Sequence, residues 1–257
     1  MDLSTILGII GAVASISIGD ILEGGNPLHL IHISSVIIIF PTAMTAAMVS
    51  TDAAYVKGAF KNLGIVFKKD AVDLNERIKE LIEYSTIARR DGLLALEPKL
   101  ADIDSEFLKM GLSMAVDGHN DEAIVETLEI MSEETEEYWH GCAHYWLLAG
   151  ETSPVMGLIG AVLGLILALQ KLDNPAEMAA GIAGAFTATV TGIFAAYVVL
   201  GPFGNKMKAK ATRIVKEQHM MLAGIVGIIH GDNPRNLETK LLNYLSPDQP
   251  KVSQFDN

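Results

Sequence analysis

The chain has 257 residues, of which 50% are hydrophobic, and it carries a formal net charge of -12. Its mean hydropathy of +0.32 is high for a soluble domain, and its charges are concentrated in a few segments, which indicates a membrane protein with polar extramembrane parts. The acidic total argues against nucleic acid as the main partner. The single cysteine, Cys142, excludes an intramolecular disulfide framework.

Four apolar segments have the length and composition of membrane spans. They cover about 3–19, 28–50 (with Pro41 inside), 152–171 and 178–201. Because a helix needs about 20 apolar residues to cross a bilayer core, we predict an all-α integral membrane protein with four transmembrane helices and a helical cytoplasmic domain. Spans three and four are rich in Gly and Ala at three- and four-residue spacing, which lets helices pack closely in lipid.

Positive charges predict the orientation of these spans. Lysines and arginines follow spans two and four, whereas the short loops at 20–27 and 172–177 contain none. The positive-inside rule therefore predicts that segments 51–150 and 202–257 are cytoplasmic, together with both chain termini. The residues used here are Lys57, Lys61, Lys68, Lys69, Lys206, Lys208, Lys210, Arg213 and Lys216. Segments 1–50 and 151–201 then form the membrane part.

The cytoplasmic segment 51–150 is predicted to be helical, with breaks at Asp91-Gly92 and Glu97-Pro98 and a turn at 117–120. Its last helix should run on into span three, since Pro154 is the first strong break. The aromatic residues near the end of that helix are expected in the lipid headgroup layer; they are Tyr138, Trp139, Tyr145 and Trp146. After the helices of segment 202–257, the tail at 246–257 is expected to be disordered.

No motif for catalysis or cofactor binding is present, so we expect neither an enzyme nor a cofactor. His140 and His144 share a helix face but lack a third ligand, which favours ordinary interfacial histidines over a metal site. Arg89, Arg90 and Glu97, with Asp91, form a compact mixed-charge patch, for which a solvated helix end is the simplest interpretation.

At this point the chain resembles a known family, the flagellar motor stator A subunits (MotA and the sodium-driven PomA) of the MotA/TolQ/ExbB ion-channel group. The resemblance is carried by ARRDGLLALE at 88–97, by Pro154 with GLIGAVLGL at 157–165, by TATVTG at 187–192 and by GP at 201–202. The four-span layout matches over essentially the whole chain. TolQ and ExbB members place their large loop after the first of three spans, so the stator branch fits better.

The resemblance implies a bacterial inner-membrane protein of flagellar rotation and chemotaxis. Five A subunits would surround two B subunits, each with a peptidoglycan-binding domain and an essential Asp on its membrane helix. The A ring would turn around B and engage the rotor switch protein FliG. By motif, Arg89, Arg90 and Glu97 match the rotor-facing charges, and Pro154 and Pro202 match the prolines of conformational coupling.

An ion path through hydrocarbon needs polar or ionisable groups, and spans three and four offer only hydroxyls, so the carboxylate must come from a partner helix. Thr189 lies on the same face of its helix as the small residues Ala185 and Gly192. We therefore predict that the Thr189 hydroxyl faces the partner's carboxylate. The alternative is that this hydroxyl bonds to a carbonyl oxygen of its own helix. These residues of span four are predicted to line the ion path, and Phe186 is predicted to line it as well.

Position Ala161 tends to be Thr in the sodium-driven relatives, so the expected ion is H⁺ and Na⁺ is less favoured. Two other functions remain open, a TolQ/ExbB-like energiser of outer-membrane processes and a non-conducting membrane scaffold.

Overall fold

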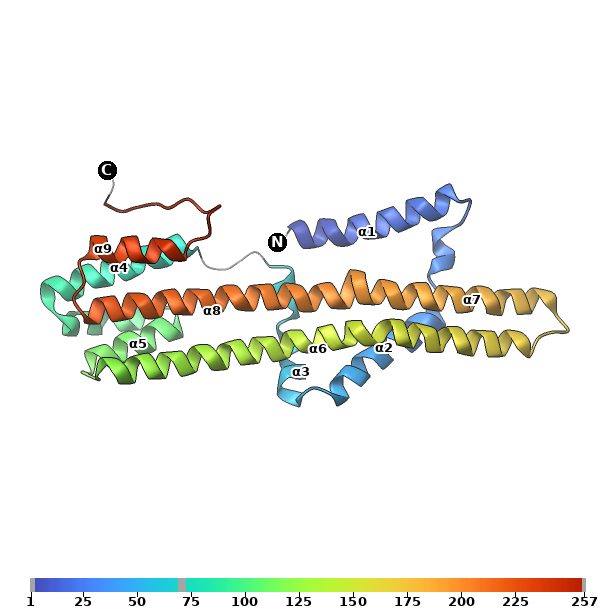
Figure 1. Ribbon diagram of the computed structural model, residues 1–257, viewed down its shortest axis with the longest axis horizontal. Helices are drawn as coiled ribbons and strands as arrows, with labels where there is room; N and C mark the ends of the chain where they lie inside the picture. The colour runs from blue at the N-terminus through green and yellow to red at the C-terminus, as the bar shows by residue number, and fades with distance from the viewer. Residues whose placement is uncertain (1–2, 69–72, 256–257) are drawn as a thin grey trace. The chain divides into compact units, whose positions relative to one another are not determined.

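The computed structural model describes residues 3–68 and 73–255, and every regular element within them is a helix (Figure 1). Predicted charge Lys69 and tail residues 256–257 lie outside the described residues. In chain order the elements are α1 (Leu3–Leu22), η1 (Pro27–Leu30), α2 (Ile33–Val49), α3 (Ala53–Lys61), η2 (Leu63–Val66), α4 (Leu74–Asp91), η3 (Leu93–Asp102), α5 (Glu106–Val116), α6 (Asp121–Leu169), α7 (Pro175–Phe194), the π-helix η4 (Ala195–Leu200), α8 (Gly201–Ile229), α9 (Pro234–Leu241) and η5 (Leu242–Tyr244).

The chain divides into two compact units. The first unit comprises residues 1–69 and 138–209, and the second comprises 70–137 and 210–257. Helices α6 and α8 contribute residues to both units. The division differs from the four consecutive segments expected from the sequence, because each of these long helices passes from one unit into the other.

Three helical stretches are long and apolar enough to cross a membrane: Leu3–Leu22, Asp121–Leu169 and Pro175–Ile229. The prediction of an all-α membrane protein is thereby confirmed. The segment predicted as span two begins differently, because the Asn26 side chain accepts a hydrogen bond from the Leu28 N–H and caps the separate turn η1. The 17-residue α2 is about 25 Å long, slightly short of a bilayer core of about 30 Å.

Helix α6 runs on into the third apolar segment, as predicted from the sequence, but it also continues without interruption through Pro154, where a break was expected. Two hydroxyls beside the proline bond back to α6: Ser153 Oγ donates to the carbonyl oxygen of Ala149 at 2.7 Å and Thr152 Oγ1 to that of Leu148 at 2.9 Å. Such hydroxyls and neighbouring helices are what allow a proline inside a membrane helix.

Aromatic rings form the centre of the first unit. Trp146 is 2% exposed, and its ring lies edge-on to those of Phe60, Tyr145 and Phe203 at centroid distances of 5.2, 5.2 and 6.1 Å. Its Nε1–H donates to the carbonyl oxygen of Ala59 at 3.3 Å. Tyr145 and Trp146 were expected in the headgroup layer, but both are buried within the protein, because α3 and the start of α8 supply partners for their rings.

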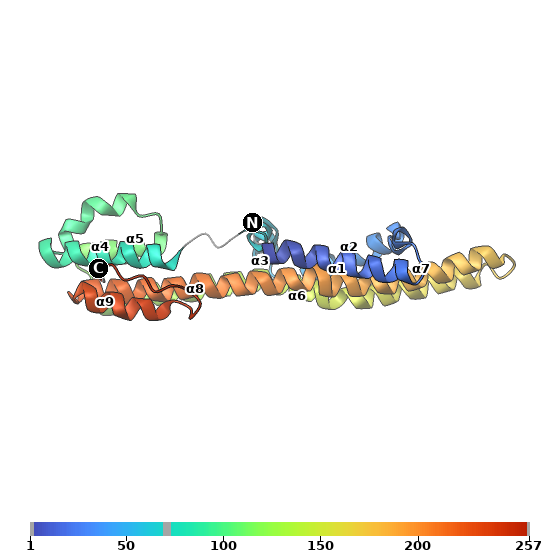
Figure 2. The ribbon, with the colours of Figure 1, turned by 90° about the horizontal axis from the view of Figure 1, so that it is seen from above.

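The second unit has a core of large aliphatic side chains. In it α4, α5 and α9 gather around residues of α6 and α8, with α4 packed against α9 (Figures 1 and 2). Leu81 of α4 fits against Gly224 of α8, where an added Cβ would lie 2.8 Å from its side chain. The fully buried residues include Leu81, Leu96, Leu108, Leu112, Ile124, Leu128 and Ile225.

The breaks predicted at Asp91-Gly92 and at 117–120 are present, whereas the one predicted at Glu97-Pro98 is not, because the 3-10 helix η3 runs from Leu93 to Asp102 with Pro98 inside it. Helix α4 ends at Asp91, and Gly92 follows with a φ of 86°, a left-handed value that favours glycine. The turn before α6 contains Gly118 with a φ of 79°, and Asn120 Oδ1 accepts from the Ala123 N–H at 2.8 Å. The sequence therefore predicts the ends of these helices well.

The tail was expected to be disordered. Over residues 246–255 it contains no helix or strand, but it is tied to α9. Glu238, which is 2% exposed, accepts hydrogen bonds from Ser253 Oγ and from the Gln254 N–H, both at 2.7 Å. The buried carboxylate thus has two partners from a segment that composition alone describes as unstructured.

Candidate functional site: a close-packed helix pair and an exposed charge patch

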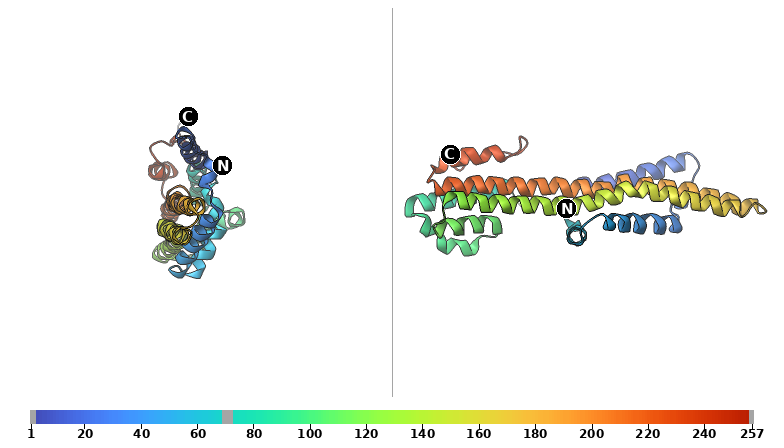
Figure 3. Two further views of the ribbon diagram at one scale, coloured as in Figure 1. Left: turned by 90° about the vertical axis from the view of Figure 1, so that its right-hand side faces the viewer. Right: turned by 60° about the horizontal axis from the view of Figure 1, so that its bottom comes forward.

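The apolar end of α6 lies beside α7 with the two backbones in close contact (Figures 1 and 3). A Cβ atom added to Gly157 would lie 3.0 Å from the carbonyl oxygen of Ala188, and one added to Gly192 would lie 2.8 Å from that of Ser153. Real Cβ atoms essentially never come within 3.0 Å of another atom, so position 192 requires glycine, whereas a side chain at 157 would force the α7 backbone to shift by a few tenths of an ångström. The small residues predicted to bring helices together therefore do so within one chain.

The contact continues toward the loop that joins the two helices. A Cβ on Gly164 would lie 3.2 Å from Ala185, and a Cβ on Gly181 would lie 2.9 Å from Ala168. Ala185 and Gly192 were expected to face a partner helix, whereas both are buried against α6 of the same chain. The difference arises because the smallest side chains occupy the tightest contact between these backbones.

The other predicted pore residues lie outside this buried contact. Ala161 of α6 and Thr189 of α7 are half-buried. Phe186 points away from α6 and is 69% exposed. The structure therefore brings Ala185 and Gly192 together with α6 and leaves Phe186 on the opposite, outward side of α7.

The three hydroxyls of α7 differ in how well they are satisfied. Thr187 Oγ1 donates to the carbonyl oxygen of Gly184 at 2.9 Å, and Thr191 Oγ1 donates to that of Thr187 at 2.8 Å. Thr189 Oγ1 lies 3.4 Å from the carbonyl oxygen of Ala185, beyond the usual O–H···O range of about 2.5–3.0 Å. Thr189 thus has the weakest bond to its own helix and the hydroxyl most available to another group.

The two predicted coupling prolines flank a single contact between helices. A Cβ on Gly150, one turn before Pro154, would lie 3.0 Å from the backbone nitrogen of Gly201, the residue before Pro202. The Gly201 N–H donates to the carbonyl oxygen of Ala196, which is the i to i−5 bond of a π-helix. Pro202 has no N–H to donate to residue 198, which explains why the widened turn η4 directly precedes it.

The charge patch lies where α4 ends and η3 begins. Arg89, Arg90 and Glu97 are all exposed, and Leu96 beneath them is fully buried. Arg90 forms a two-oxygen ion pair with Asp91, with Nη2 2.6 Å from one carboxylate oxygen. Each partner shifts the other: the hydrogen bond raises the pKa of the Arg90 guanidinium and lowers the pKa of the Asp91 carboxyl.

Within the described residues, no ion pair joins Glu97 to either arginine. Glu97 therefore stays separate from the arginines, whereas Arg90 is paired with Asp91. The backbone of the patch is fixed by Gly92 and by the anchor of Leu96 in the core.

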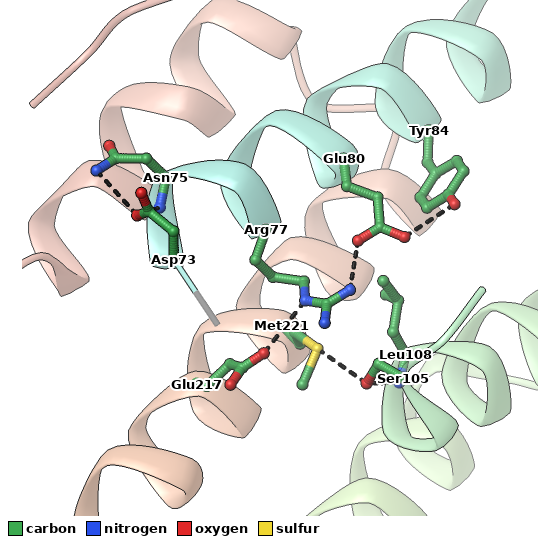
Figure 4. A network of polar contacts seen from close by, with 9 residues as sticks. All are labelled: Asp73, Asn75, Arg77, Glu80, Tyr84, Ser105, Leu108, Glu217 and Met221. Atoms are coloured by element: carbon green, nitrogen blue, oxygen red, sulfur yellow. Dashed lines mark hydrogen bonds and ion pairs between the residues drawn. The ribbon is translucent and has the colours of Figure 1, made fainter. Parts of the chain in front are cut away.

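A polar network that the sequence analysis missed holds α4 on α8 (Figure 4). Arg77 of α4 donates to Glu80 on the same helix and to Glu217 of α8, the latter at 3.2 Å. Burial disfavours the charge of Arg77, but the attraction and hydrogen bonds of both glutamates outweigh it and raise the pKa of the guanidinium. The side chain of Arg77 is 12% exposed.

Tyr84 extends this network by donating to Glu80 at 3.0 Å. Burial, followed by the hydrogen bond and negative charge of Glu80, raises the pKa of the Tyr84 phenol. The spacing of Arg77 and Glu80 at i and i+3 could have indicated the pair on α4. Nothing in the local sequence indicates Glu217, which is 140 residues away.

Within residues 3–68 and 73–255, no three side chains of metal-ligand type converge. His140 is half-buried and His144 is exposed on α6. The functional geometry of the described chain thus consists of the helix pair and the charge patch.

Comparison with known proteins gives consistent matches. The family described as "MotA/TolQ/ExbB proton channel family" matches residues 99–220. Motility protein A of Helicobacter pylori is 62% identical over 256 residues, covering 100% of both chains. Motility protein A of Bacillus subtilis is 37% identical, covering 95% of this chain and 91% of that protein.

Solved structures agree with these relatives. A chain of C. jejuni MotAB has a TM-score of 0.96 and 59% identity, with 99% of this chain and 100% of that chain covered. A chain of the flagellar MotAB stator complex from Bacillus subtilis has a TM-score of 0.87 and 36% identity, with 95% and 96% covered. The resemblance seen in the sequence motifs is confirmed, and the chain belongs to the MotA/TolQ/ExbB proton channel family.

Proposed function

We propose that this protein is the A-type stator subunit of a bacterial flagellar motor, which converts an ion-motive force into torque on the rotor. The observation that carries the proposal is full-length similarity, at 59% identity, to a chain of the MotAB structure. A relative that is 62% identical is a motility protein A. The partner is accordingly a B subunit of the MotB kind.

The ion path is proposed to run along α7, beside a carboxylate that the B subunit supplies. In segments 152–170 and 178–201, which cover the paired apolar helices, the sequence contains no Asp, Glu, Lys or Arg. A path across hydrocarbon needs such a group, so a second chain must provide it. Thr189 is the proposed hydroxyl for this contact because its bond to its own helix is the longest of the three α7 threonines.

The transported ion is proposed to be H⁺. A proton can pass along hydroxyls and waters, whereas Na⁺ needs several oxygen ligands in place of its hydration shell. Ala161 contributes no hydroxyl to the half-buried position that it occupies on α6. Swimming that persists with a proton uncoupler but stops when sodium is withdrawn would refute this assignment.

The charge patch is proposed to contact the rotor switch protein FliG. Arg89 and Arg90 lie at the C-terminal end of α4, where cations are favoured by the helix dipole, and their side chains extend into solvent. An exposed patch on a rigid scaffold suits a contact that is made and broken repeatedly. We further propose five A subunits to two B subunits, both A termini in the cytoplasm, and a role without enzymatic activity or bound cofactor.

Deletion of the gene tests the whole proposal. Cells without the protein should assemble normal filaments and fail to swim, and the wild-type gene should restore swimming. Normal swimming combined with failed energy-dependent uptake across the outer membrane would support an energiser of the TolQ/ExbB kind. Normal swimming together with normal uptake would support the third function, a non-conducting membrane scaffold.

A further inference from the structure

Glu238 of α9 is a buried carboxylate that the C-terminal tail covers. It is 2% exposed, and its two carboxylate oxygens accept hydrogen bonds from Ser253 Oγ and from the Gln254 N–H, both at 2.7 Å. A carboxylate that leaves water needs hydrogen bonds or a counter-charge in place of the water. Because both donors come from residues 253–254, Glu238 is a docking point for this part of the tail.

The tail reaches Glu238 because it reverses direction at residues 246–249. Leu245, which is 5% exposed, anchors the start of the tail in the core of the second unit. The Gln249 N–H donates to the Ser246 carbonyl oxygen at 2.9 Å, and the Ser246 N–H donates to Gln249 Oε1 at 3.0 Å. Pro247 occupies the second position of this turn, where its fixed φ is favoured. The chain then runs back along α9 (Figures 1 and 2).

Beyond Glu238 the tail reaches α4. Gln254 and Phe255 form one side of a groove of about 690 Å³, and residues between 76 and 87 of α4 form the other side. Phe255 is 40% exposed, so more than half of its surface is covered. The α4 residues in this groove include Thr86 and Ile87, which lie one turn before the arginines of the charge patch. The tail thus connects α9 to the end of α4 that carries the patch.

Few contacts hold the returning part of the tail. Residues 250–252 are exposed and belong to no helix or strand. The docked residues that follow are held by the bonds to Glu238 and by the partial burial of Phe255. Segments with exposed backbone and few buried apolar contacts open at low free-energy cost, independently of the rest of their domain. The tail can therefore detach while the core of the second unit stays folded.

We propose that residues 246–255 are a releasable strap, which docks on Glu238 and holds α4 against α9. The closed strap restricts the motion of residues 84–91 of α4 and thereby positions the charge patch. Release of the strap leaves the helices folded and lets this end of α4 move. The effect on torque rests on the proposed stator function, whereas the docking of the strap does not.

Hydrogen–deuterium exchange of the full-length protein in complex with its B subunit tests the docking. Ser253→Ala removes one donor to Glu238, so the Gln254 amide should exchange about tenfold faster, the effect of losing one hydrogen bond to a charged group. Residues 84–91 of α4 should also exchange faster, and α5 should exchange at the wild-type rate. Wild-type exchange at Gln254, or at residues 84–91, would overturn the proposal. Faster exchange in α5 would also overturn it, because the whole unit would then be loosened.

Ser246→Ala is the matched control. It removes a hydroxyl from the same tail, and in the part of the chain that the structure describes this hydroxyl makes no hydrogen bond. Exchange of Gln254 and of α4 should stay at the wild-type rate in this variant. The same acceleration in both serine variants would contradict a specific role of Ser253.

Glu238→Leu locates the docking point. This variant removes the acceptor, so Gln254 and residues 84–91 should exchange at least as fast as in Ser253→Ala. Adding Ser253→Ala to Glu238→Leu should then have no further effect, because the hydroxyl has already lost its partner. Additive effects of the two changes would place the tail's docking point elsewhere and overturn the proposal.

Torque and proton flux in cells test the positioning of the patch. Ser253→Ala should lose part of the torque and keep proton flux at the wild-type level, whereas Ser246→Ala should keep both. Wild-type torque in Ser253→Ala, together with faster exchange of α4, would overturn the positioning role. If deletion of the gene leaves swimming intact, the stator function fails, but the exchange measurements still decide whether the strap docks on Glu238.

Discussion

The two units of this protein use glycine in opposite ways. In the first unit, Gly157 and Gly192 bring the backbones of α6 and α7 into direct contact. In the second, Gly224 makes room for the side chain of Leu81, and Gly111 makes room for Ile225. In lipid, burying a leucine gains little, so helices associate through close backbone packing. In water, burial of large apolar side chains drives folding, and glycine serves to accommodate them.

The largest effect is expected from breaking the helix pair of the first unit. In Gly192→Leu, the new side chain would begin 2.8 Å from the carbonyl oxygen of Ser153, which cannot move without bending α6. We expect loss of folded protein and of swimming. Ala183→Leu, on an exposed position of the same helix, is the control and should leave both unchanged. Protein content of the membrane and swimming speed are the measurements, and a folded Gly192→Leu protein would contradict the account.

The next effect concerns the core of the second unit. Leu81→Ala removes a side chain with 0% exposure and should cost about 2–5 kcal/mol of unfolding free energy. Leu158→Ala, at a position that is 60% exposed on α6, should change stability by less than about 0.5 kcal/mol. Thermal unfolding of the full-length protein compares them. Equal destabilisation would show that the two units do not differ as described.

A smaller effect is expected from the Arg77 network, a polar link between α4 and α8. Arg77→Met leaves Glu217 without its partner, and we expect a loss of roughly 1.5–3 kcal/mol, the value of hydrogen bonds to charged groups. Adding Glu217→Leu should restore part of this loss, because the unpaired carboxylate is then absent. A double-mutant cycle measures the coupling, and strictly additive losses would argue against a direct interaction.

The smallest effect is a decrease in folding stability at alkaline pH. The pKa of Tyr84 is raised in the folded protein by burial and by Glu80, so folding favours the protonated phenol. Its contribution to stability is full below the unfolded pKa of about 10 and is lost as the pH rises above it. Tyr84→Phe should therefore lose less stability than wild type between pH 8 and pH 11. Identical losses in thermal unfolding would contradict the raised pKa.

Local sequence signals predicted the helix ends well. Gly92, Gly118 and Asn120 act within a few residues, and the extension of α6 into the apolar segment follows from a single long helical pattern, although the break expected at Pro154 does not occur. Periodicity also identified the small-residue faces of α6 and α7. These features depend on neighbours in the chain, which a sequence displays directly.

Features that depend on distant partners were harder to predict. Tyr145 and Trp146 resemble interfacial rings in sequence, but Phe60 and Phe203 enclose them. The stripe containing Ala185 was correctly identified as a packing face, but the sequence does not state which helix covers it. The exposed patch at Arg89, Arg90 and Glu97 was predictable from its composition, whereas its support by Leu96 required the fold.

The central claim assigns ion passage to α7 in the first unit and rotor contact to the charge patch in the second. Measuring proton flux and motor torque in the same two variants tests it most directly. Thr189→Val should lose both proton flux and torque, because the Thr189 hydroxyl is only weakly bonded to its own helix. Thr187→Val is the control and should keep both, because the Thr187 hydroxyl is well bonded to its own helix. Glu97→Lys should lose torque and keep proton flux. Proton flux at the wild-type level in Thr189→Val, or its loss in Glu97→Lys, would contradict this division of function.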